Sequence, residues 1–174
     1  IFAAQFLVGG MNKGEKCLYI TFEEKKKQFY ENMGTLNWDL EEYEKKGLFT
    51  FLEYTQIKVK TMLEEGGGVI ESIIFEKKIS RIVIDSMTSF ELLFENELSK
   101  REAALSLFEM IRDWNCTCLL TLEEDPLHEK KTSAIEFEVD SATMIYLVRK
   151  KKERERFIEV FKMRGTEHSK KIYP

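Results

Sequence analysis

The sequence is poor in cysteine, proline and histidine, because its 174 residues contain only three, two and two of them. An odd number of cysteines provides no disulfide framework, and so few cysteines and histidines, far apart, argue against a zinc site. We therefore expect a reducing compartment, the cytoplasm. No apolar run approaches the ~18 residues that a membrane-spanning helix needs, so we expect no insertion into a membrane.

The sequence also lacks an excess of one charge, because 27 lysines and arginines are balanced by 31 aspartates and glutamates. The net charge of -4 provides no general attraction for nucleic acid or for an acidic membrane surface. The apolar fraction of 43% is that of a globular protein. A chain of this length can bury about 70% of its unfolded surface. We expect a single domain over residues 1–174.

Residues 81–90, RIVIDSMTSF, contain a short β-branched run, Ile82 to Ile84, that stops at Asp85. A strand that is apolar on both faces belongs to a parallel sheet covered by helices. Ligands of such sheets bind at the carboxyl ends of the strands, where a carboxylate can hold Mg²⁺ beside a nucleotide phosphate. The alternative is a structural role for Asp85, because aspartate commonly starts turns and caps helices.

Strand and helix patterns alternate through residue 122. The helical pattern occupies residues 1–9, 29–36, 38–46, 57–78 and 99–113, and the strand pattern occupies residues 17–22, 48–51, 82–84 and 116–122. A polar loop follows over residues 123–138, and then two strands, 144–148 and 157–163, joined by a charged tip. This order predicts an α/β fold with a mostly parallel sheet, flanked by helices, and a C-terminal antiparallel hairpin.

Two more carboxylates follow the first predicted strand, because Glu23 and Glu24 come directly after residues 17–22. The carboxyl ends of parallel strands lie on one edge of the sheet, so we expect Glu23 and Asp85 to meet at one crevice. Two acids there suit hydrolysis, with one holding a metal ion and the other orienting or deprotonating water. The alternative for Glu23 and Glu24 is a charged first turn that favours a helix N-terminus.

Five segments resemble KaiC-like ATPases of the RecA superfamily, in that family's order and at similar spacing. They are residues 19–24 (YITFEE), 36–40 (LNWDL), 47–49 (GLF), 81–89 (RIVIDSMTS) and 161–168 (FKMRGTEH). The last segment is the most specific, since a K-x-R-G-T-x-H run at the end of a strand is hard to obtain by chance. The resemblance covers nearly the whole chain and implies a RecA-like P-loop NTPase core.

The resemblance implies roles for individual residues of this sequence. Asp85 looks like the Walker B aspartate that supports Mg²⁺. Glu23 and Glu24 resemble the pair of glutamates that activates the attacking water. Thr35 and Leu36 match positions that contact the adenosine. ATP and Mg²⁺ are therefore the ligands that the resemblance implies.

Other residues match positions that act near or across a boundary between subunits. Those that the resemblance expects to reach ATP on a neighbouring subunit are Arg156, Lys162, Arg164, Thr166 and His168. Lys162 and Arg164 would also take part in catalysis, and we expect them to share one strand face with Arg156, because side chains alternate along a strand. Thr121 resembles a polar sensor position. The implied assembly is a homo-oligomeric ring, a hexamer, with ATP between subunits.

The sequence departs from the family at the phosphate-binding loop. No G-x-x-x-x-G-K-[ST] occurs in the 174 residues, although residues 1–7 read like the helix that follows this motif in the family. We expect the motif upstream of Ile1, and we expect the family's last strands to be missing as well. We expect ATP hydrolysis to be slow. Because the sequence shows no second substrate site, we expect hydrolysis to serve regulation or signalling.

Two other functions stay open. A nucleotide-binding regulatory module that does not hydrolyse ATP, like the archaellum accessory ATPase, would work through a protein partner. A DNA-repair ATPase like RadA would need basic loops, whereas residues 90–97, FELLFENE, are acidic and apolar. The charged tip, residues 149–156, is either a solvated strand end or a contact for nucleic acid or an acidic partner. It carries no aromatic platform, so we do not expect a nucleic-acid partner; autophosphorylation is left open.

Overall fold

The computed structural model describes residues 1–123 and 138–174, so most of the expected polar loop, residues 124–137, lies outside the described residues. Contacts divide the chain into two compact units, Ile1–Leu127 and His128–Pro174. The single domain expected from the sequence stays a prediction. Within the described parts, no helix is both long and apolar enough to cross a bilayer.

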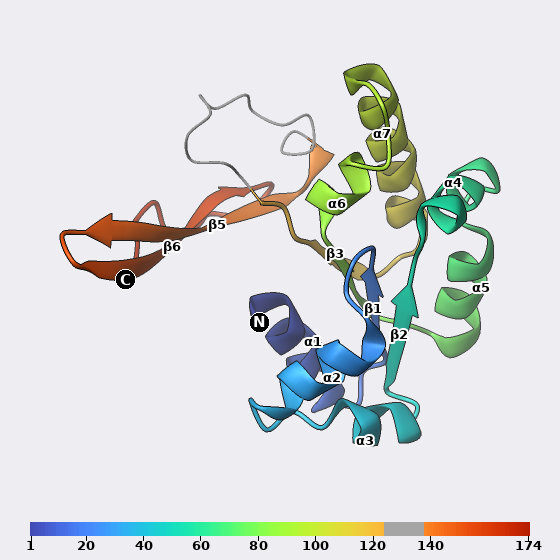
Figure 1. The fold of residues 1–174 in the computed structure, drawn as a ribbon, viewed down its shortest axis with the longest axis horizontal. Coiled ribbons are helices and arrows are strands. Elements are labelled where there is room, and N and C mark those ends of the chain that lie inside the picture. Colours follow the sequence, from blue (N-terminus) through green and yellow to red (C-terminus); the bar gives the residue numbers. More distant parts are fainter. Residues whose placement is uncertain (124–137) are drawn as a thin grey trace. The chain divides into compact units, whose positions relative to one another are not determined.

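The first unit is built on a sheet of four parallel strands (Figure 1). The strands are β1 (Cys17–Thr21), β2 (Phe49–Glu53), β3 (Arg81–Asp85) and β4 (Thr117–Leu120), in the order β2-β1-β3-β4. Every residue of β1 is buried, as are the central residues of β3. Strands that are apolar on both faces need cover on both sides, and this sheet has it, which confirms the predicted fold class.

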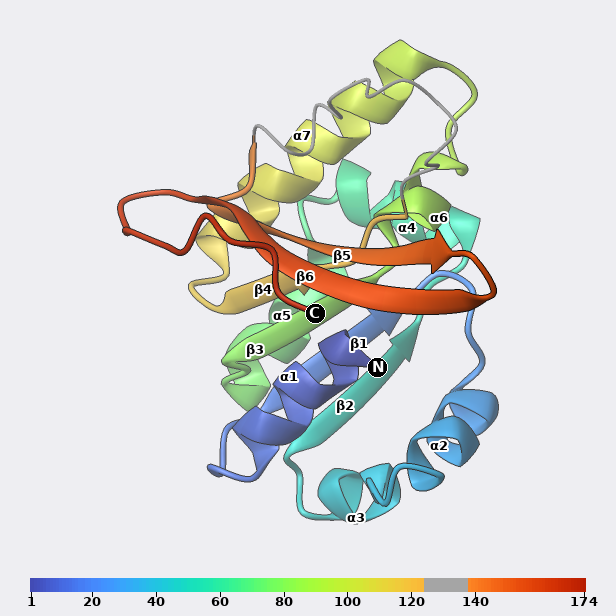
Figure 2. The same ribbon diagram turned by 90° about the vertical axis from the view of Figure 1, so that its left-hand side faces the viewer.

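Helices cover both faces of the sheet (Figures 1 and 2). One side carries α1 (Phe2–Met11), α2 (Lys26–Gly34) and α3 (Leu40–Lys45), and the other side carries α4 (Gln56–Glu64), α5 (Gly68–Lys77) and α7 (Glu97–Asp113). The short α6 (Met87–Glu91) follows β3 directly. The expected helix over residues 57–78 is divided into α4 and α5, because Gly66 and Gly67 lie between them and Gly68 begins α5, all three with positive φ angles.

An apolar core joins α1, α2 and α3 to the sheet. The core includes Tyr19, whose ring centroid lies 4.3 Å from that of Phe29 and 5.5 Å from that of Phe51. Each aromatic pair of this kind adds about 0.5–1.5 kcal/mol beyond the burial of its surface. Because Tyr19 lies on β1, Phe29 on α2 and Phe51 on β2, the three rings tie the start of α2 to the sheet.

The second unit contains a two-stranded antiparallel hairpin of β5 (Ser141–Lys150) and β6 (Glu153–Met163). This confirms the predicted C-terminal hairpin. The turn is shorter than the predicted tip, because only Lys151 and Lys152 lie between the strands. The other charged residues of the tip continue the two strands, since an exposed hairpin tolerates charged side chains on its strands.

A bulge near the end of β6 changes which side chains share a face. Val160 pairs with Thr143, whereas Lys162 pairs with Ala142, so β6 has one more residue here than β5. Paired residues of antiparallel strands project on one face, and consecutive residues project on opposite faces. Since Thr143 and Ala142 are consecutive, Val160 and Lys162 project on opposite faces.

The sequence-based expectation that Arg156, Lys162 and Arg164 line one strand face is therefore wrong. Lys162 lies beyond the bulge, and Arg164 follows the last residue of β6. Counting alternate positions cannot detect an extra residue in one strand, because a bulge is defined only by the pairing with the other strand.

One arginine holds the start of β3 to α1. The Arg81 guanidinium donates to both carboxylate oxygens of Glu15, to one of them at 3.2 Å, and to the carbonyl oxygen of Phe6 at 2.9 Å. It also lies 4.8 Å from the centroid of the Phe6 ring. The absence of a side chain at Gly10 makes room for it, since a Cβ there would lie 2.7 Å from Cδ and Nε of Arg81.

We expect Gly10→Ala to be less stable than Gly9→Ala. A Cβ at Gly9 meets nothing within 4 Å, and alanine favours a helix over glycine by about 0.8–1 kcal/mol. Alanine at Gly10 has the same helix-propensity advantage, but its methyl group must displace Arg81 from Glu15, and the loss of that contact lowers stability. Urea denaturation measures both free energies of unfolding. Equal stability of the two variants would contradict this role of the close approach at Gly10.

Candidate functional site

Asp85 ends β3 in the interior of the sheet, between β1 and β4. It pairs with Thr21, the last residue of β1. Its two carboxylate oxygens accept hydrogen bonds from opposite sides, Oδ2 from the hydroxyl of Tyr19 and Oδ1 from the hydroxyl of Thr121. The carboxylate is therefore held at the carboxyl edge of the sheet, which is the edge at which open α/β folds bind ligands.

Glu23 lies two residues beyond β1, at the same edge. Its Oε1 accepts a hydrogen bond from the hydroxyl of Ser89, which belongs to α6, just after Asp85. The hydroxyl oxygen of Thr21 accepts hydrogen bonds from the backbone N–H groups of Glu23 and Glu24, at 3.3 and 3.0 Å. Glu23 and Asp85 thus lie at one edge of the sheet, where the sequence predicts them.

Glu24 is half-buried beside the other two acids. The side-chain amide of Asn32, in α2, donates to its Oε1 at 3.2 Å. Burial raises the pKa of the Glu24 carboxyl above its ordinary value; the bond from Asn32 opposes this shift, and the charge of Asp85 adds to it. Carboxylates that repel one another in this way favour a bound cation.

The two residues that the family resemblance places near the adenosine lie just after α2. The hydroxyl of Thr35 donates to the carbonyl oxygen of Asn32 at 2.7 Å. Thr35 and Leu36 are both exposed. Since the side chain of Asn32 binds Glu24, one residue connects this turn to the acidic edge of the sheet.

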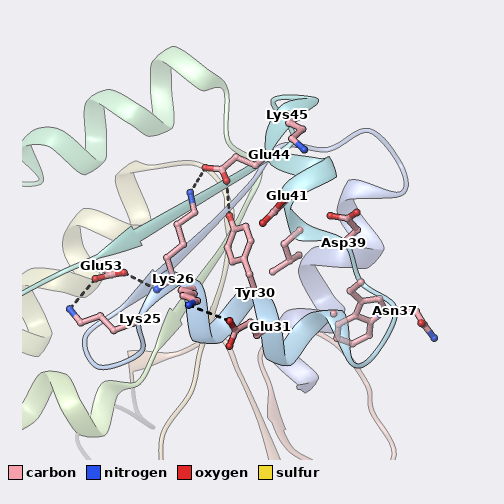
Figure 3. A pocket seen from close by; sticks show the side chains of 14 residues that line it. Lys25, Lys26, Tyr30, Glu31, Asn37, Asp39, Glu41, Glu44, Lys45 and Glu53 are labelled. Atoms are coloured by element: carbon pink, nitrogen blue, oxygen red, sulfur yellow. Dashed lines mark hydrogen bonds and ion pairs between the residues drawn. The ribbon is translucent and has the colours of Figure 1, made fainter.

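A groove of about 1200 Å³ opens between α2 and α3 (Figure 3). Its lining includes Gly34 and Asn37, which flank the two adenosine candidates, but none of the three acids at the sheet edge. Lys26 pairs with Glu44 at 2.7 Å, and the hydroxyl of Tyr30 donates to the same carboxylate at 3.0 Å. Such paired charges offer no excess of cations to a phosphate, so we assign no ligand to the groove.

The remaining candidates belong to the second unit. They are Arg156 and Lys162 on β6, and Arg164, Thr166 and His168 after it. The backbone N–H of Arg164 donates to the carbonyl oxygen of Asp140 at 2.8 Å, and its Nη1 lies 3.9 Å from Oδ1 of the same residue. The Nδ1 atom of His168 lies 3.1 Å from the carbonyl oxygen of Ser169. The segment after β6 is thus anchored through its backbone.

The predicted residues fall into two groups. The three acids, Thr121, Thr35 and Leu36 belong to the first unit, and Arg156, Lys162, Arg164, Thr166 and His168 belong to the second. Sequence reasoning did not single out Tyr19, Ser89 or Asn32, which position the acids. In the sequence, Tyr19 resembles any other core residue of an apolar strand. The only feature that could have indicated a role in the site is a hydroxyl group close to the end of the strand. Ser89 lies within the RIVIDSMTSF stretch without an assigned role, and nothing in the sequence pairs Asn32 with Glu24.

A protein-family model described as "ATPase: KaiC" matches residues 1–174. The chain belongs to the KaiC ATPase family. The crystal structure of a KaiC-like protein from Pyrococcus horikoshii aligns with a TM-score of 0.86 and 30% identity, over 99% of this chain and 78% of that one. This KaiC-family chain therefore has the RecA-type fold that its sequence resemblance implies.

Relatives match the whole of this KaiC-family chain. Circadian clock protein KaiC3 from Synechocystis is 30% identical over 183 residues, which are 100% of this chain and 36% of the relative. A UPF0273 protein from Pyrococcus furiosus is 30% identical over 189 residues, which are 100% of this chain and 75% of the relative. The chain spans about a third of the clock protein and three quarters of the UPF0273 protein.

We expect the carboxyl of Glu24 to titrate at a higher pH than an exposed glutamate, and Asp85→Asn to lower its pKa. The substitution removes a negative charge that disfavours ionised Glu24. NMR titration of the glutamate side-chain carbons measures both values. Glu91 is the internal control, because burial also raises its pKa but Asp85 makes no contribution. A Glu24 pKa that stays constant, or moves together with that of Glu91, would refute the coupling.

Proposed function

We propose that this domain binds ATP with Mg²⁺ and hydrolyses it slowly, in a homo-oligomeric ring, a hexamer, with ATP between subunits. Hydrolysis would serve regulation or signalling. The observation that carries the proposal is the carboxyl edge of the sheet, where Glu23, Glu24 and Asp85 lie together. Membership of the KaiC ATPase family supports an ATPase-type activity, and the name of one relative, a circadian clock protein, supports a regulatory role.

Asp85 is the residue that would hold the metal ion. Hydroxyl groups from β1 and from the end of β4 fix its carboxylate. Carboxylate oxygens are ligands that Mg²⁺ prefers, and the two neighbouring glutamates add negative charge, so the residues present fit the ion. Bound there, Mg²⁺ would neutralise charge on the β- and γ-phosphates of ATP.

The two glutamates would prepare the attacking water. Ser89 binds one oxygen of Glu23, and the side chain is otherwise exposed, so its other oxygen can orient a water molecule. A raised pKa makes Glu24 a better proton acceptor near neutral pH. We assign the two glutamates to activating the water, with Glu23 orienting it and one of the two carboxylates accepting its single proton.

Cationic residues of the second unit, Arg164 foremost, would act on ATP held by a neighbouring subunit. Arg164 and its acid partner Asp140 are 53% and 94% exposed, and a pair so open to solvent is worth about 0–1 kcal/mol. A triphosphate carries more charge than one carboxylate and would therefore replace Asp140. Head-to-tail contacts of this kind form a ring when the rotation from one subunit to the next closes, and the proposed hexamer is such a ring. Lys162, Thr166 and His168 would contact the same nucleotide, whereas Arg156 projects from the opposite face of β6 to Lys162 and would not contact it together with them.

We expect Glu23→Gln in the full-length protein to keep ATP binding and to lose about 10²–10⁴-fold in turnover, because an amide cannot accept a proton. Asp85→Asn should instead raise the Mg²⁺ concentration that binding requires. Phosphate release measures turnover, and a fluorescent nucleotide measures binding. The full-length protein is needed because no G-x-x-x-x-G-K-[ST] occurs in these 174 residues.

The control for these variants is Glu41→Gln, which removes an exposed carboxylate of α3, outside the acidic edge. It should keep both binding and turnover. Unchanged turnover in Glu23→Gln and in Glu24→Gln would refute the assigned roles. A wild-type protein that binds ATP but does not hydrolyse it would replace the proposal with the non-hydrolysing regulatory module.

We also expect Arg164→Ala to abolish most turnover while ATP binding remains, because an arginine that acts in trans is worth about 10³–10⁵-fold in rate. Mixing Arg164→Ala subunits with Glu23→Gln subunits should restore part of the activity. Some boundaries in a mixed ring then combine an intact Glu23 on one subunit with an intact Arg164 on the next. Turnover of the mixture, relative to each variant alone, measures this complementation.

The matched control mixes Arg164→Ala subunits with an Arg164→Ala, Glu23→Gln double variant, which can form no competent boundary. Formation of mixed rings is checked by native mass spectrometry. Failure of the first mixture to regain activity, while mixed rings form, would show that Arg164 serves its own subunit.

A further inference from the structure

We propose that Tyr19 is a positioning residue for the metal site, whose hydroxyl holds the Asp85 carboxylate in the orientation that Mg²⁺ requires. This role rests on the proposed ATPase function and extends it to a residue of the core. Tyr19 lies two residues before the end of β1 and is 2% exposed. Its ring serves packing, but packing does not require the hydroxyl, because phenylalanine would fill the same space.

Strand register explains why Tyr19 can reach Asp85. Tyr19 pairs with Val83, and Thr21 pairs with Asp85, in the parallel ladder of β1 and β3. Side chains two residues apart on a strand share a face, so Tyr19 and Asp85 project on the same side of the sheet. As diagonal neighbours they lie within reach of an aromatic side chain. The Tyr19 hydroxyl donates to Oδ2 of Asp85.

The hydroxyl of Tyr19 is a fixed donor. Its ring is packed against Phe29 and Phe51, which limits its movement within the core. A phenol is protonated at neutral pH, so the hydroxyl acts as the hydrogen-bond donor to the carboxylate.

Thr121 completes the arrangement from the other side, since its hydroxyl donates to Oδ1 of Asp85. With one hydroxyl on each oxygen, any rotation of the carboxylate breaks a hydrogen bond. Hydrogen bonds from outside the ligand set orient the ligands of metal sites, and the loss of one typically costs about 10–100-fold in metal affinity or activity. Tyr19 is thus a positioning residue rather than a ligand.

Tyr19→Phe in the full-length protein tests this role by removing one oxygen atom. Binding of a non-hydrolysable fluorescent ATP analogue is measured in EDTA and over a Mg²⁺ titration. We expect the Mg²⁺ concentration at half-saturation to rise about 10–100-fold, while the affinity in EDTA stays unchanged. Thr121→Val, which removes the second hydroxyl, should shift the Mg²⁺ titration in the same direction.

Tyr30→Phe is the matched control. Tyr30 belongs to the same aromatic cluster, with its ring centroid 6.0 Å from that of Phe51, and its hydroxyl also donates to a carboxylate, that of Glu44. The Tyr30→Phe variant therefore loses a similar hydrogen bond at a place away from Asp85, and its Mg²⁺ titration should match that of the wild type.

Three results would overturn the proposal. An unchanged Mg²⁺ titration in Tyr19→Phe would show that Asp85 needs no help from the hydroxyl. An equal loss of affinity with and without Mg²⁺, accompanied by a lower melting temperature, would identify a merely structural residue. A wild-type protein whose nucleotide binding is independent of Mg²⁺ would instead refute the proposed metal site itself, which separates that failure from a failure of Tyr19 alone.

Discussion

The hydrogen bonds that the Asp85 carboxylate accepts from both sides are the constraint on which the candidate site depends. They exist because β3 lies between β1 and β4, so that a neighbour on each side supplies a hydroxyl. A carboxylate at the end of an edge strand would have a neighbour on one side only. The parallel ladder also places Thr21 opposite Asp85, and the Thr21 hydroxyl then binds the backbone of Glu23 and Glu24. The register of β1 against β3 thus positions all three acids, Asp85 directly and the two glutamates through Thr21.

The charges of this fold are distributed unevenly. Elsewhere in the first unit, several acids have cationic partners, as in the pairs of Arg81 with Glu15 and of Lys26 with Glu44. At the carboxyl edge, the carboxylates of Glu23, Glu24 and Asp85 accept hydrogen bonds from hydroxyl and amide groups, and in the described parts of the chain none of them forms an ion pair. Hydrogen bonds from neutral donors orient a carboxylate without neutralising it. The edge therefore keeps the negative charge that attracts a metal ion, at the cost of repulsion when none is bound.

The sequence could predict the sheet and the position of its acids, but not the contacts that orient them. Apolar runs that end in acids define β1 and β3, and the rule that parallel strands end at one edge brings Glu23 to Asp85. Tyr19 was beyond prediction, because its role depends on a diagonal contact that exists only after two strands pair in one register. The bulge in β6 was beyond prediction for the same reason, since an extra residue is defined only against a partner strand. Local pattern determines the elements, whereas pairing determines which side chains meet.

The two units carry complementary charge. Glu23, Glu24 and Asp85 lie at one sheet edge of the first unit, and the second unit carries Lys162 on the last strand of its hairpin and Arg164 just after it. Acids alone would attract the metal ion but repel a triphosphate, and the cations alone would attract the triphosphate but not the metal ion. ATP with Mg²⁺ carries both signs within one ligand, so the proposed ligand would satisfy both groups at once. If the two groups that meet on one nucleotide come from different subunits, as the proposed ring requires, a single subunit offers only half of the charges that recognise it.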